Sequence, residues 1–90
     1  MNLPETIDQG VAYLTARGFK AMRREWAMGT SLFAFIGNSK TDGSELSEFG
    51  LYIYQKDSRW FVEMGQGQET GFPTLGPAVL FAEKQLKARL

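Results

Sequence analysis

Two short stretches decide the fold, SLFAFI at residues 31–36 and GLYIYQ at residues 50–55. Both are too short for a buried helix, and both are rich in aromatic and other side chains that favour strands. Successive side chains of a strand point to opposite faces of a sheet, so the large rings alternate with the aliphatic residues between them. The two stretches therefore predict strands with one aliphatic and one aromatic side.

Each stretch has a neighbour with which it can form a hairpin. The paired strands are predicted to be residues 19–26 with 31–37, and residues 50–55 with 60–66. Their turns fall at Met28-Gly29 and at Asp57-Ser58, because Gly, Asp and Ser adopt turn conformations readily. Residues 38–50 are polar and are predicted to form a long surface loop between the two hairpins.

A helix is predicted at each end of the chain. The first covers residues 3–17, from an N-cap at Asn2 to Gly18, which suits the left-handed residue that closes a helix. The second follows an N-cap at Thr74. The apolar stripes are Leu3, Ile7, Val11 and Leu14 in the first helix, and Val79, Ala82, Leu86 and Leu90 in the second. The order α-β-β-β-β-α predicts one α+β domain, residues 1–90, with two helices on one face of a four-stranded antiparallel sheet.

The composition excludes several classes of function. The 90 residues include ten Lys and Arg, ten Asp and Glu, and no His or Cys. The chain therefore lacks the usual ligands of zinc, haem and iron–sulfur centres, and it lacks a general base that titrates near neutral pH. We predict a non-enzymatic domain with no metal and no cofactor. The absence of Cys and of a signal-like N-terminal segment predicts a cytoplasmic location without membrane contact.

Sequences that partly match phosphate-binding motifs do not meet the required spacing. Residues 37–41, GNSKT, follow a strand, but Ser39 stands where a phosphate-binding loop requires Gly. The glycines at positions 65, 67 and 71 miss the spacing of a dinucleotide-binding loop, and Phe72-Pro73 stands where its helix should begin. These segments are interpreted as turns and connections.

Strand register sorts the sheet side chains onto two faces, provided that each hairpin loop has an even number of residues. The aliphatic face carries Ala21, Leu32, Ala34, Ile36, Leu51, Ile53, Trp60, Val62 and Met64. The opposite side, here called the aromatic face, carries Met22, Trp26, Phe33, Phe35, Tyr52, Tyr54 and Phe61, fringed by Arg24, Lys56, Arg59 and Glu63. We assign the aliphatic face to the helices. The aromatic face is then left in water, as an apolar patch larger than a lone monomer usually exposes.

The aromatic face suggests two kinds of binding function. The leading hypothesis is binding of a protein partner or a second copy, because Tyr, Trp, Phe and Arg are enriched at interfaces. We expect the interaction surface to comprise Arg24, Trp26, Phe33, Phe35, Tyr52, Tyr54, Lys56, Arg59, Phe61 and Glu63. The alternative is a module in which Tyr52, Tyr54 and Phe61 stack on single-stranded nucleic acid or on a planar small ligand. The neutral net charge favours a protein, because nucleic-acid surfaces usually carry a basic excess.

The aromatic face also has a purely structural explanation, and an enzymatic hypothesis is a third possible function. Aromatic pairs across strands are also good sheet packing, and Lys and Arg side chains can lie over the rings and keep them soluble. The helices could instead cover the aromatic face. A three-residue turn between residues 50–55 and 60–66 would move Trp60 from the aliphatic to the aromatic face. An enzyme would have to rely on Glu63 with Tyr52 or Arg59. The size and the lack of catalytic residues are similar to those of many small α+β bacterial immunity and antitoxin-like proteins; this is an analogy of fold and composition, and it only favours an immunity or regulatory type among the binding functions.

Overall fold

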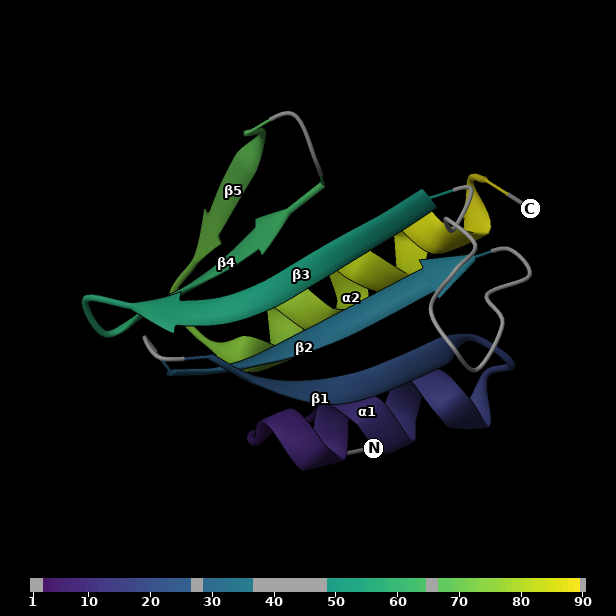
Figure 1. The fold of residues 1–90 in the computed structure, drawn as a ribbon, viewed down its shortest axis with the longest axis horizontal. Helices are drawn as coiled ribbons and strands as arrows, with labels where there is room; N and C mark the ends of the chain where they lie inside the picture. Colours follow the sequence, from purple (N-terminus) through teal and green to yellow (C-terminus); the bar gives the residue numbers. More distant parts are fainter. Residues whose placement is uncertain (1–2, 27–28, 37–48, 65–66, 90) are drawn as a thin grey trace.

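The computed structural model describes residues 3–26, 29–36, 49–64 and 67–89, and it has an α+β architecture (Figure 1). The elements are α1 (Ile7–Ala16), β1 (Lys20–Trp26), β2 (Gly29–Ile36), β3 (Phe49–Lys56), β4 (Arg59–Glu63), β5 (Glu69–Phe72) and α2 (Leu75–Lys87). The strands form one antiparallel sheet in the order β1-β2-β3-β4-β5. Residues 37–41 and most of the predicted loop 38–50 lie outside the described residues. In the described part, no helix is long and apolar enough to cross a membrane.

The sheet has one strand more than the sequence predicts. β5 occupies part of a stretch that we expected to be a connection, because Gly71 and Pro73 are poor strand formers. It pairs on one side only, with β4, and places Phe72 opposite Trp60. The ring of Phe72 lies 5.3 Å from that of Phe81 in α2. Pairing with β4 and packing against α2 therefore stabilise a strand that its own residues do not favour.

The first helix is shorter than predicted, because it begins at Ile7 and its N-cap is Thr6. The Thr6 hydroxyl accepts a hydrogen bond from the Gln9 backbone N–H at 3.1 Å, and the Gln9 side chain accepts one from the Glu5 N–H at 2.8 Å. This reciprocal capping replaces the predicted cap at Asn2, which lies outside the described residues.

Two other predicted helix boundaries are confirmed. Gly18 has a φ of 89°, in the left-handed region, directly after the C-cap Arg17. The following N–H, that of Phe19, donates to the Leu14 carbonyl at 3.1 Å, which closes the helix. Thr74 is the N-cap of α2, although its side chain makes no capping hydrogen bond.

The turn at Asp57-Ser58 determines which side chains of β3 and β4 share a face. Both residues have positive φ, 54° and 66°, as in the two-residue turns whose twist matches that of paired strands. Tyr54 therefore pairs with Phe61, as the even-loop register requires. The first hairpin has the same kind of register, because residues 27–28 separate β1 from β2.

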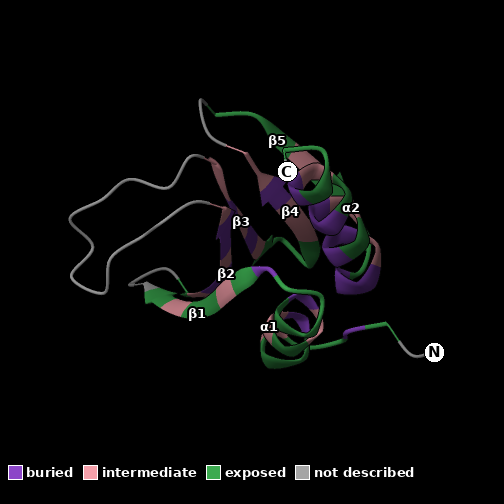
Figure 2. Cartoon of the chain, turned by 90° about the vertical axis from the view of Figure 1, so that its right-hand side faces the viewer, coloured by how far each residue is buried: buried purple, intermediate pink, exposed green. Residues whose placement is uncertain are grey.

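Both helices lie on the same side of the sheet (Figures 1 and 2). α1 packs on β1 and β2, whereas α2 packs on β3, β4 and β5. The core between these layers consists of Leu14, Phe19, Leu32, Ala34, Leu51, Ile53, Val62, Leu75, Ala78, Val79, Ala82 and Leu86. Trp60 packs against this core, so it lies on the helix side as predicted. The aliphatic face is thus the covered one.

One buried charge joins the two helices. The Glu83 carboxylate, on α2, forms an ion pair with the Arg17 Nε at 2.9 Å and accepts a hydrogen bond from the Tyr13 hydroxyl at 2.9 Å. Lys87 approaches the same carboxylate at 3.4 Å, and the Arg17 guanidinium lies 3.5 Å from the centre of the Tyr13 ring. Burial raises the pKa of Tyr13, and so does its hydrogen bond to Glu83.

Candidate functional site

The structure gathers the predicted site residues on the sheet face opposite the helices. One row across the five strands is Met22, Phe33, Tyr52, Glu63 and Glu69, and the next is Arg24, Ser31, Tyr54, Phe61 and Gly71. Lys20 and Phe35 extend the rows toward one end of the strands, and Lys56 and Arg59 toward the other. The side chain of Trp26 lies outside the described part of the molecule.

The rings of this face form two groups, and the rings within each group pack on one another. Phe33 stacks on Phe35 with ring centres 5.0 Å apart, and it contacts Tyr52 at 4.8 Å. Tyr54 stacks on Phe61 at 5.9 Å. Phe35 is buried, whereas the other four rings are half-buried. The predicted cluster is therefore a packed layer of rings whose outer surface faces away from both helices.

Cationic side chains lie over these rings. The Arg24 guanidinium is 4.4 Å from the centre of the Phe33 ring, and it donates a long hydrogen bond of 3.5 Å to the Tyr52 hydroxyl. The Lys56 ammonium lies 5.1 Å from the Phe61 ring centre. Each such contact contributes about 0.5 to 1 kcal/mol at an exposed site. These contacts support the structural explanation in part, because they keep an apolar layer compatible with water.

Among the described residues, the acidic side chains of the aromatic face lie at its β4–β5 edge, where Lys56 and Arg59 also lie. Glu63 and Glu69 are direct cross-strand partners on β4 and β5, and like charges in such positions repel each other. Lys56 lies 3.8 Å from the Glu69 carboxylate. Glu63 is half-buried and has no hydrogen-bond or ion-pair partner among the described residues. On β1, at the opposite edge, the charged side chains of this face are those of Lys20 and Arg24.

Sequence reasoning missed two charged members of this face. Lys20 pairs with Phe35 and its ammonium lies 5.9 Å from that ring. The alternation of β1 already placed Lys20 on the same side as Arg24, so this residue could have been included. Glu69 had no such signal, because β5 was not recognised as a strand.

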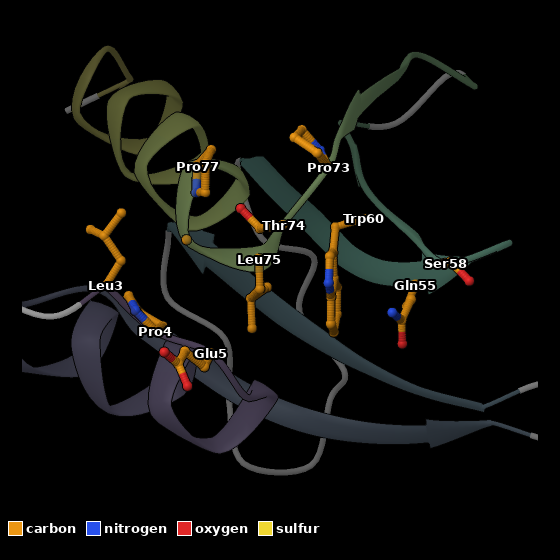
Figure 3. Close-up of a pocket in the computed structure, with 11 residues that line it drawn as sticks. Leu3, Pro4, Glu5, Gln55, Ser58, Trp60, Pro73, Thr74, Leu75 and Pro77 are labelled. Carbon is orange, nitrogen blue, oxygen red and sulfur yellow. The ribbon is translucent and has the colours of Figure 1, made fainter.

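A cleft of about 580 Å³ lies on the helix side of the sheet. Trp60 stands at one side of it and Leu3 and Pro4 at the other, with Leu75 between them (Figure 3). Among the described residues that line it, Glu5 is the only ionisable one, so the cleft contains no acid–base pair. It was not predicted, because it forms only where the segment before α1 runs beside the start of α2.

Two further predictions about chemistry can be placed on the described residues. Glu63, which the enzymatic hypothesis requires, lies opposite Tyr52 and on the same face as Arg59. No group of three or more acidic side chains in the described part is arranged to hold a metal ion. No family model, curated protein or solved structure matches the chain.

Proposed function

We propose that this chain is a non-enzymatic domain that binds a protein through its aromatic face, in an immunity or regulatory type of interaction. The observation that carries the proposal is the layer of rings on the side of the sheet away from both helices. Four of these rings, Phe33, Tyr52, Tyr54 and Phe61, are half-buried and interleaved with Arg24 and Lys56. Aromatic residues and Arg are the types enriched at the centres of protein interfaces.

Sheet stability alone does not require this composition. An antiparallel sheet that packs on helices with one face commonly carries polar side chains on the other. Rings on that face leave apolar surface in water, which favours association when the rings lie together. The face thus has the composition of a binding surface, even though the cations over it also serve solubility.

The test compares face substitutions with a substitution elsewhere on the surface. Tyr52→Ser combined with Tyr54→Ser removes two rings from the face, whereas Leu80→Ser removes an exposed apolar side chain from α2. We expect the tyrosine variant to lose self-association in light scattering, or to lose bound proteins in a pull-down, while Leu80→Ser retains both. A strict monomer whose captured proteins are unchanged by the tyrosine substitutions would contradict the proposal.

A second candidate is binding of single-stranded nucleic acid or a planar ligand to the Tyr54–Phe61 stack. The specific support is that Lys56 and Arg59 lie beside these rings and could neutralise phosphates. The acidic pair at the β4–β5 edge acts against it by repelling phosphates. Anisotropy of a labelled oligonucleotide should rise on binding and fall as salt is added. No change at low salt removes nucleic acid from consideration.

A further inference from the structure

We propose that the partner of the aromatic face is a second copy of this chain, docked face to face about a twofold axis that runs parallel to the strands along β3. The inference rests on the proposed function and names its partner. Rotation about this axis places β1 of one copy over β5 of the other and β2 over β4, while β3 faces itself. Each contact therefore occurs twice.

Charge complementarity selects this arrangement. The β1 edge of the aromatic face carries Lys20 and Arg24, and the β4–β5 edge carries Glu63 and Glu69 in the row of Phe33, with Arg59 two rows further along β4. The rotation sets Lys20 and Arg24 on β1 of each copy on the same side as Glu63 and Glu69 of the other, while Arg59 faces the end of β2. A twofold axis across the strands through the row of Phe33 would instead set β1 over β1, with Lys20 over Arg24 and Glu63 over its own counterpart. Such contacts disfavour the wrong orientation.

The rows of the sheet identify one pair of residues at the centre of this complementarity. Glu63 and Phe33 lie in the same row, on β4 and β2, so Glu63 of one copy faces Phe33 of the second copy. The Arg24 guanidinium lies over that same Phe33 ring, 4.4 Å from its centre. Arg24 of each copy is thus positioned to meet Glu63 of the other. This contact supplies the counter-charge that the half-buried Glu63 lacks within the described chain, where it stands opposite Glu69.

The rest of the interface follows from the same rows. Tyr52 and Tyr54 on β3 face the same strand of the second copy, and Glu69 faces the exposed Met22, which Lys20 and Arg24 flank. Five strands about 4.8 Å apart and about 20 Å long cover roughly 400 Å² in plan, and side-chain relief raises the accessible area of the face. The accessible area of the face is therefore at most the ~800 Å² that each partner contributes to a standard interface. We expect a weak dimer whose dissociation constant rises with salt.

A charge swap tests the pairing by sedimentation velocity at low salt. Arg24→Glu and Glu63→Arg, each alone, set like charges against each other twice in a homodimer, so each should raise the dimer dissociation constant at least about tenfold. An equimolar mixture of the two variants should associate about as well as the original chain, because both pairs are then opposite in sign. Both substitutions in one chain should also restore the dimer. Lys84→Glu, at an exposed site on α2, serves as the control and should leave association unchanged.

The outcomes separate this inference from the proposed function. A monomer at the highest protein concentration, or a mixture that associates no better than its components, overturns the second copy as partner. If the chain is monomeric but the tyrosine variant loses a captured protein, the face binds a different protein and the proposed function stands. If neither association nor capture responds, both are wrong. Circular dichroism of each variant establishes that it is folded.

Discussion

At the scale of single residues, Glu83 is a buried charge that depends on its partners for stability. The residue is 8% exposed, and its carboxylate contacts the side chains of Arg17, Tyr13 and Lys87. A buried charge is tolerated only while its partners remain, because removal of one partner leaves the others desolvated without compensation. Tyr13 and Glu83 are 70 positions apart in the sequence, so no local pattern predicts their hydrogen bond.

Removal of this charge should weaken the contact between the helices. We expect Glu83→Gln to lower the free energy of unfolding by about 1 to 2 kcal/mol, because Arg17 loses its carboxylate partner. Urea unfolding measures the change. Lys84→Gln alters the next residue of the same helix at an exposed position and should change stability by less than about 0.5 kcal/mol. Equal effects of the two substitutions would argue against a stabilising role for Glu83.

The stability of the protein should also depend on the ionisation of Tyr13. Burial, followed by the hydrogen bond to Glu83, raises its pKa above the ordinary value of 10.0. The folded-state pKa exceeds the unfolded one, so the neutral phenol contributes stability that is fully present below pH 10 and is lost as the pH rises through the folded-state pKa. We expect unfolding free energies to fall more steeply with alkaline pH in the original chain than in Tyr13→Phe. Parallel pH profiles of the two proteins would contradict this expectation.

At the scale of elements, the β3–β4 hairpin depends on a turn whose residues are not ideal for it. Asp57 and Ser58 both have positive φ, which costs a residue with a side chain more than it costs Gly. Asp-Gly is a favoured sequence for such two-residue turns. The turn therefore stores a small strain that one substitution can remove.

Ser58→Gly should stabilise the hairpin by about 0.5 to 1 kcal/mol, because relief of the positive φ outweighs the extra backbone entropy of the unfolded chain. Thermal or urea unfolding is the measurement. Ser58→Ala keeps a Cβ at the strained position and serves as the matched control, for which no gain is expected. A loss of stability on Ser58→Gly would show that the Ser side chain contributes more than the strain costs.

The approach of α1 to the sheet depends on Gly10. A Cβ at this position would lie 2.9 Å from Leu32 Cδ1 and 3.4 Å from Val79 Cγ2, both in the closed core. Gly10→Val should therefore destabilise the fold by about 2 kcal/mol through overpacking, measured by urea unfolding. Ala12→Val places the same side chain at an exposed position of α1 and should cost no more than about 0.7 kcal/mol of helix propensity. Similar costs at both positions would exclude the close approach as the cause.

At the scale of the whole molecule, we expect stability to be concentrated in β2 and β3, two of the three internal strands of the sheet. β2 and β3 pair on both sides, and their residues Leu32, Ala34, Leu51 and Ile53 are completely buried. β5 has four residues and a single neighbouring strand. We expect the slowest hydrogen–deuterium exchange, followed residue by residue by NMR, in the amides of β2 and β3, and faster exchange in β5. Slower exchange in β5 than in β3 would place the stable core elsewhere.

The parts of the fold that were predictable depend on short stretches of chain. Alternation in residues 31–36 and 50–55 indicates both faces of the sheet, and adjacent turn residues at Asp57-Ser58 set the register between β3 and β4. The aromatic face follows from the same alternation. Such signals are readable because strand periodicity and turn conformation are local properties.

The parts that were missed depend on distant partners. β5 exists through its pairing with β4 and the contact of Phe72 with Phe81. Asn2 and Thr6 are both suitable N-caps by residue type, and the structure uses Thr6. The chain before Thr6 runs beside α2, so closely that a Cβ on Gly76 would lie 2.8 Å from the Leu3 Cβ. Neither contact has a local sequence signal, because the residues involved meet only after the sheet and helices have packed.

The local residue pattern alone is sufficient to predict the α+β class, the existence of both helices and the separation of aliphatic from aromatic side chains. Each of these follows from the periodicity of side chains within one helix or one strand. Tertiary packing decides the fifth strand, the ion pair of Glu83 with Arg17, and the opposition of a basic edge at β1 to the acidic pair Glu63 and Glu69. The physical reason is that the charge pattern of a sheet face depends on which strands lie side by side. The order and number of those strands are set by pairing between residues that are distant in sequence.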